Sequence, residues 1–171
     1  MEEEDRPQVW LLYGWYSGLM CLGSVFGAVA WGAWMQYLVA LFSTATPGLT
    51  LAQAQSLNAQ TQYWGAAFYV TYAMEFLCLS VAKLLVLHRM ADFAVAKGDG
   101  MSRRWAVGGR VVMAVVVVGN VVGLCGNVAA AVYSKEAGDL NMAASAAYAA
   151  NNTNAGEKLN NLALQKYSVA S

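Results

Sequence analysis

Charged residues are scarce in this sequence, and that scarcity excludes an ordinary water-soluble domain. Only 12% of the 171 residues are Asp, Glu, Lys or Arg, against about 25% in soluble globular domains. Hydrophobic residues make up 58% of the chain. Water is therefore not expected to be the main solvent of this protein.

Residues that carry catalysis or bind metals are also few. The three cysteines, Cys21, Cys78 and Cys125, lie far apart inside apolar runs, which fits neither a disulfide framework nor a metal site. His88 is the only histidine, and no Ser, Cys or Asp constellation of triad type lies beside it. The glycines at 98–109 match no phosphate-binding loop. We therefore predict no catalytic residue, no metal, no cofactor and no enzymatic activity.

Three long apolar segments are present instead, at residues 10–42, 63–87 and 105–133. Each exceeds the roughly 20 helical residues that cross a bilayer core of about 30 Å. Backbone groups in lipid must pair within the segment, so even the valine-rich third segment is predicted to be helical. The acidic start lacks the basic region of a signal peptide, which makes the first segment a retained anchor. The predicted fold class is all-α, an integral membrane protein with three transmembrane helices.

The remaining segments differ in charge, and this difference predicts the topology. An acidic arm (1–9) precedes the first span, a neutral loop (43–62) follows it, and a basic loop (88–104) follows the second. Because cytoplasmic loops are enriched in Lys and Arg, the basic loop and the N-terminus are predicted to be cytoplasmic. The neutral loop and a polar, Ala/Asn-rich helical tail (134–171) then face the lumen or the exterior. The cations of the inner loop and its borders are Arg89, Lys97, Arg103, Arg104 and Arg110.

Two sequence features bear on this topology. The cations next to two spans favour anionic lipid headgroups over nucleic acid as their counter-charge. The tail also contains one glycosylation sequon, Asn151-Asn152-Thr153, which would be accessible on the lumenal side. Such three-residue matches are frequent, so Asn151 is a candidate and weak support for the orientation.

Pairs of glycines four residues apart occur in the first and third spans. This spacing lets helix backbones approach closely in lipid, where packing drives association. The alternative is that glycine is simply common in membrane helices. The pairs are Gly14 and Gly18, Gly23 and Gly27, and Gly119 and Gly123.

Glu75 is the strongest candidate for a functional residue within the membrane, because it lies near the middle of the second span. A carboxylate at mid-bilayer costs at least about 2.5 kcal/mol on insertion scales and usually faces the interior of a helix bundle. Asn120 falls at a similar depth in the third span and is a plausible hydrogen-bond partner, with Asn127 on the same helix face. Lys83 is interpreted mainly as an anchor at the inner interface. Glu75 is either a protonatable or ligand-binding group, or a polar contact between helices.

These observations support two hypotheses on function. The first is a packing or assembly subunit, or the N-terminal part of a larger polytopic protein, whose partners are the lipid bilayer and other membrane helices. The alternative is a transporter, channel or sensor module with a polar site around Glu75. The sequence identifies no substrate and no organelle.

Overall fold

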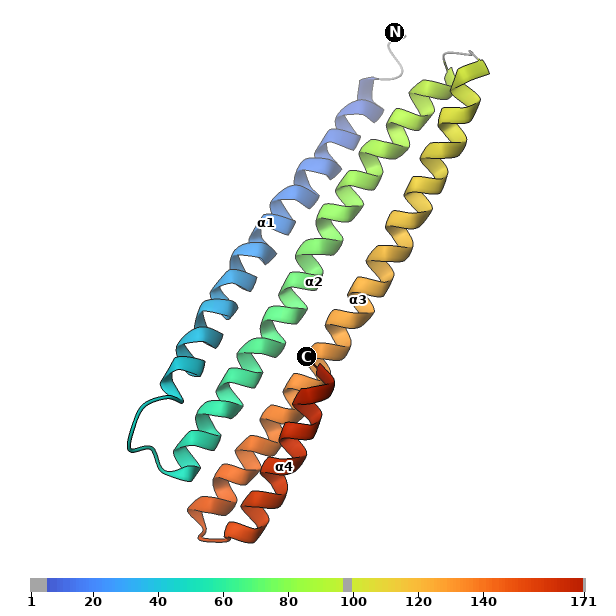
Figure 1. Ribbon diagram of the computed structural model, residues 1–171. Helices are drawn as coiled ribbons and strands as arrows, with labels where there is room; N and C mark the ends of the chain where they lie inside the picture. The colour runs from blue at the N-terminus through green and yellow to red at the C-terminus, as the bar shows by residue number, and fades with distance from the viewer. Residues whose placement is uncertain (1–5, 97–99, 171) are drawn as a thin grey trace. The chain divides into compact units, whose positions relative to one another are not determined.

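The computed structural model describes residues 6–96 and 100–170, and within them the side chains of residues 10–90 and 107–168. In this part of the chain all regular secondary structure is α-helix, and turns connect the helices (Figure 1). It contains four helices: α1 (Arg6–Ser43), α2 (Leu51–Ala96), α3 (Gly100–Ala149) and α4 (Thr153–Ala170). The predicted all-α fold class is confirmed.

Three of these helices are long and apolar enough to cross a membrane. The segments that meet this criterion are Trp10–Ser43, Leu51–Met90 and Val107–Ala149. At about 1.5 Å per residue, the 50 residues of α3 extend about 75 Å, well beyond a bilayer core of about 30 Å. Each long helix therefore has helical turns outside the apolar layer.

The helices also extend further than the changes in polarity suggested. The loop expected at 43–62 is shorter, because α2 begins at Leu51, and α1 already begins at Arg6 within the expected arm. The polar tail is not separate from the third span either, since α3 continues from Tyr133 to Ala149. Its alanine-rich sequence favours helix in water as well as in lipid, so no break accompanies the change in polarity.

The start of α2 is determined locally by a capping box. Thr50 donates its backbone N–H to Gln53 Oε1 (3.0 Å), and Gln53 donates its backbone N–H to Thr50 Oγ1 (3.3 Å). The reciprocal pair satisfies two amide groups that a helix start leaves unpaired. Gly48 provides the preceding turn with a backbone φ of 89°.

The connection between α3 and α4 is a Schellman turn. Asn151 adopts a left-handed φ of 59°, and the backbone N–H groups of Asn151 and Asn152 bond to Tyr148 O (3.0 Å) and Ala147 O (2.9 Å). The Asn152 side chain then caps α4 by accepting from the Ala155 N–H (3.2 Å). The chain reverses here, and α4 runs back beside the C-terminal part of α3 (Figure 1).

The helices contribute to two compact units. Unit 1 joins α1 up to Phe26 with Met74–Leu124 of α2 and α3, and unit 2 joins Gly27–Ala73 with the chain from Cys125 onward. Small side chains occupy the helix contacts in both. In unit 1 these include Cys78 and Ala82, and in unit 2 they are Ala30, Ala33, Ala40, Ala59, Ala73, Ala131, Ala137, Ala144 and Ala163.

Many large apolar side chains, in contrast, are exposed. Trp15 is 64% exposed on α1, and Val115 and Val122 are each 66% exposed on α3. Such an arrangement would be costly in water but suits lipid, where small residues bring backbones together and large ones face acyl chains. The small side chains at the helix contacts and the large ones on the surface thus fit a membrane environment, as do the length and apolar character of the three helices.

Aromatic rings join α1 to α2 within unit 2. Trp34 stacks on Tyr37 with ring centroids 4.9 Å apart, and it contacts Phe68 of α2 at 5.1 Å. Phe68 stacks in turn on Tyr72 at 5.6 Å. These contacts fix the end of α1 against the first half of α2.

The close contact between α4 and α3 provides a test of this packing. A Cβ at Gly156 would lie 2.6 Å from Tyr148 Cε1, so Gly156→Ala forces the ring to move and should destabilise the protein by about 1–3 kcal/mol. Gly126→Ala is the matched control, because no atom lies within 4 Å of its new Cβ. The control should be neutral or stabilising by up to about 1 kcal/mol. Thermal unfolding in detergent measures both, and Tyr148→Leu should restore stability to Gly156→Ala.

Candidate functional site

Unit 1 contains the predicted intramembrane polar residues of α2, but their contacts differ from expectation. Ser80, which is 7% exposed, donates its hydroxyl hydrogen to Asn120 Oδ1 of α3 at 3.0 Å. Within the described part of the chain, no hydrogen bond or ion pair joins Glu75 to Asn120. Ser80 lies five residues after Glu75, about 140° around the helix, so the two side chains leave α2 in different directions. Similar depth alone did not identify the partner of Asn120.

The other predicted polar residues are not gathered into one site. Glu75 is partly exposed and Lys83 is exposed, both in unit 1. Asn127 is half-buried and belongs to unit 2. Of the four candidates, the structure thus places three in one unit, and it joins Asn120 to α2 through a side chain that sequence reasoning had missed. The only sequence signal for this hydrogen bond would have been the serine itself, a polar residue within the apolar run of α2.

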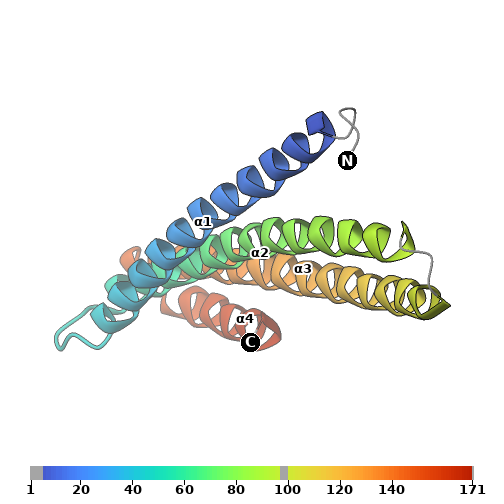
Figure 2. The same cartoon turned by 90° about the horizontal axis from the view of Figure 1, so that it is seen from above.

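The predicted glycine pairs divide into contacting and open positions. Gly23 and Gly27 are buried, and a Cβ at Gly23 would lie 3.2 Å from Leu79 Cδ2 of α2. Gly14 and Gly18 are exposed, and no described atom lies within 4 Å of a Cβ built on either one. Figure 2 shows α1 diverging from α2 toward its N-terminal end.

The third-span glycines behave similarly. Gly119 is open, whereas a Cβ at Gly123 would lie 3.9 Å from the Phe76 ring. Glycine packing is therefore used inside the chain at some positions and left available at others.

The predicted basic inner loop is described only at its borders. Arg89 is half-buried near the end of α2, and Arg110 is exposed on α3. Lys97 lies outside the described residues. Arg103 and Arg104 belong to the first turns of α3, but their side chains lie outside the described part.

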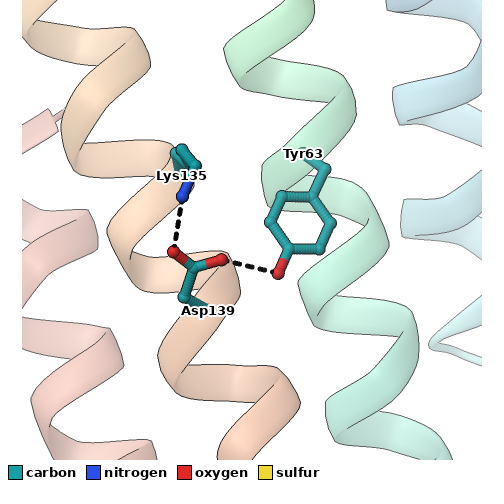
Figure 3. A network of polar contacts seen from close by, with 3 residues as sticks. All are labelled: Tyr63, Lys135 and Asp139. Carbon is teal, nitrogen blue, oxygen red and sulfur yellow. Dashed lines mark hydrogen bonds and ion pairs between the residues drawn. The ribbon is translucent and has the colours of Figure 1, made fainter.

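A polar network in unit 2 links α2 to α3 beyond Tyr133 (Figure 3). The Tyr63 hydroxyl donates to Asp139 Oδ1 at 2.8 Å, and Lys135 Nζ donates to Asp139 Oδ2 at 2.7 Å. Gly138 allows the close approach, since a Cβ there would lie 2.9 Å from Tyr63 Cε1. The Lys135–Asp139 spacing of four residues is a sequence signal for the ion pair, but not for the tyrosine.

Further polar contacts join the start of α2, the C-terminal part of α3 and α4 to one another. Gln55 Nε2 donates to Asn160 Oδ1 (3.0 Å), and the Ser145 hydroxyl donates to the Ala52 carbonyl (2.7 Å). Lys166 of α4 pairs with Glu136 of α3, and this hydrogen bond raises the pKa of Lys166. The polar segments of unit 2 are thus joined into a bundle by side-chain hydrogen bonds.

In the described part of the chain, no group of three or more His, Cys, Asp or Glu side chains is arranged to hold a metal ion. The chain matches no protein-family model, and comparisons with curated proteins and with solved structures found no match. The geometry is consequently the basis for a functional assignment.

The Ser80–Asn120 bond is testable in unit 1. Ser80→Ala leaves the Asn120 amide without this partner, so it should destabilise the protein by about 0.6 kcal/mol, with about 1.7 kcal/mol as an upper bound. Ser24→Ala is the matched control, because the Ser24 hydroxyl bonds to Met20 O of its own helix at an exposed position. Reversible unfolding in mixed micelles measures both. Equal stability changes in the two variants would contradict an interhelical role for Ser80.

Proposed function

We propose that this protein is a multi-pass membrane protein that serves as a packing or assembly subunit, either in a homo-oligomer or in a larger complex. In this proposal α1, α2 and α3 cross the bilayer, the N-terminus is cytoplasmic, and α4 lies on the lumenal or extracellular side. The role is structural, so no enzymatic activity is proposed. Its partners are the lipid bilayer and the membrane helices of other subunits.

The observation that carries the proposal is the position of Glu75. It lies near the middle of the apolar part of α2, yet no residue of the described chain donates a hydrogen bond to it or pairs with it. A carboxyl group left without a partner in lipid is costly. A polar group on a helix of another subunit would remove that cost, so association with such a helix is favoured.

The surface around α1 and α3 supports the same proposal. The most apolar window of α3 has none of its residues buried within the chain, against 22% for α1 and α2. Gly14 and Gly18 leave the α1 backbone open to close approach. Both features suit contact with further helices, although lipid alone could cover the apolar side chains.

A transporter, channel or sensor module is the second candidate function. The same partly exposed Glu75 favours it, because an intramembrane carboxyl group that can gain and lose a proton is typical of ion and proton pathways. Three spanning helices are few to enclose a path, so this candidate also needs association with other helices. The two proposals differ in whether the charge of Glu75 is required.

The size of the native complex tests the assembly proposal. Glu75→Ala removes the polar group and should shift the protein from a discrete large species to a smaller one on blue-native electrophoresis in mild detergent. Glu75→Gln keeps a neutral hydrogen-bonding group and should retain the large species. Met74→Ala, a truncation at the adjacent exposed residue, is the matched control and should leave the size unchanged.

Two outcomes would contradict this proposal. A monomeric wild-type protein would exclude stable assembly. An unchanged large species in Glu75→Ala would show that Glu75 is not required for assembly. If Glu75→Ala and Glu75→Gln both assemble normally but both abolish proton flux in liposomes, the transport candidate replaces it.

The proposed orientation is tested at Asn151. This residue is exposed in the α3–α4 turn. Expression in a glycosylating cell should therefore give a glycosidase-sensitive increase in apparent mass that Asn151→Gln abolishes. An N-terminal tag carrying its own sequon is the control. Modification of that tag instead of Asn151 would reverse the orientation.

A further inference from the structure

Unit 2 contains a cavity of about 200 Å³ to which all four helices contribute. Its lining is uncharged, and amide and hydroxyl side chains from segments far apart in the sequence add polar groups to a surface that is otherwise apolar. The lining residues are Tyr37 and Leu41 from α1, Asn58, Thr61 and Gln62 from α2, Asn141 from α3, and Asn160, Ala163, Leu164 and Tyr167 from α4.

The cavity has a buried floor and an exposed rim. Thr61, Asn141 and Ala163 are 4%, 7% and 2% exposed and form the floor. Leu41 and Leu164 are 41% and 59% exposed and lie at the rim. A molecule entering past the rim would therefore reach groups that are removed from bulk solvent.

Asn141 is the most informative residue of the floor. Its side chain is among the buried polar groups, and no hydrogen bond joins its amide to any described residue. None of its side-chain atoms is among the fully enclosed polar atoms that lack a partner, so the amide is accessible from the cavity. Since this amide lines the cavity, a molecule inside the cavity can supply the missing hydrogen bonds.

Other amides of the lining are similarly available. Asn58 and Gln62 are half-buried, and their side chains form no hydrogen bond with the described residues. Asn160 accepts from Gln55 Nε2 at 3.0 Å, which fixes its Oδ1 and leaves the two Nδ2 hydrogens to donate. Gln55 is itself 7% exposed, so it holds Asn160 from the side as a positioning residue.

Hydroxyl groups complete the set. The Thr61 hydroxyl donates to the Leu57 carbonyl at 3.0 Å, so its oxygen can still accept a hydrogen bond. Tyr37 and Tyr167 lie close enough to interact with each other across the lining. The cavity therefore offers both donors and acceptors, and it has apolar ring surface as well.

We propose that this cavity is a binding site for a small uncharged polyol, such as a monosaccharide. Each hydroxyl group of a polyol both donates and accepts, which matches amides that offer both functions. None of the described residues that line the cavity is Asp, Glu, Lys, Arg or His, so no described side chain there balances an ionic ligand. Its volume of about 200 Å³ is roughly 15 times the space that one water molecule needs, and it lies below the range of about 300–1,000 Å³ for drug-sized ligands.

The site is independent of the assembly role of Glu75, which belongs to unit 1. The test uses the full chain in nanodiscs with three probes, glycerol, D-glucose and myo-inositol, and with gluconate as a charged control. Saturation-transfer NMR detects contact with each probe, and equilibrium dialysis of the radiolabelled compound gives its affinity. At least one uncharged probe should bind saturably, and gluconate should bind at least tenfold more weakly.

Two matched variants make the test specific. Asn141→Leu replaces the unpaired amide with an apolar group of similar shape, so it should weaken polyol binding at least tenfold while keeping or raising the thermal midpoint. Asn161→Leu changes an exposed asparagine of α4 outside the lining and should bind as the wild type does. Gln62→Leu removes an amide that α2 contributes to the lining. It should also weaken polyol binding, and it replaces Asn141→Leu in the test if that variant fails to fold.

Three outcomes would overturn the proposal. The first is that no polyol of the three binds the wild-type protein saturably, which would leave the cavity to water alone. The second is that gluconate binds as tightly as the uncharged probes, which would contradict selection by neutral groups. The third is that the folded Asn141→Leu variant, or Gln62→Leu in its place, binds with wild-type affinity, which would place the polyol elsewhere.

Discussion

Close approach of helix backbones is the constraint on which the rest of this structure depends. Lipid gives little hydrophobic drive for two apolar helices to associate, so the contacts rely on packing and on a few hydrogen bonds. Alanines, Cys78 and Gly23 allow the helices to approach closely, while large side chains such as Trp15, Val115 and Val122 are exposed. Narrow contacts in turn bring short polar side chains within reach, as Ser80 and Asn120 illustrate.

The two units satisfy this constraint in different ways. Unit 1 combines small-residue contacts with the Ser80–Asn120 bond, and parts of its α1 surface remain open. Unit 2 adds aromatic stacking between α1 and α2, helix caps at the chain reversals and several polar bonds between helices. Water competes for hydrogen bonds beyond the apolar layer, so a polar bundle there depends on several such contacts together.

Sequence reasoning succeeded where a single helix determines the answer and failed where several helices meet. Apolar length identified three helices that could cross a membrane, because each can pair its backbone alone. It did not give the ends of the helices, since α3 stays helical through Tyr133, where only polarity changes. Counting residues gave the depth of Asn120 but not the direction of Glu75 around α2. The cavity was inaccessible to such reasoning, because Tyr37 and Tyr167 meet only in the folded chain.

Glu75 and Asn141 are both polar side chains without a partner among the described residues, yet their surroundings require different solutions. Glu75 is partly exposed on a helix whose neighbouring surface is apolar, so another helix can reach it. Asn141 lies at the floor of a cavity too narrow for a helix of about 10 Å in diameter but large enough for several water-sized groups. The cost of burying a polar group therefore favours association in one unit and a small ligand in the other.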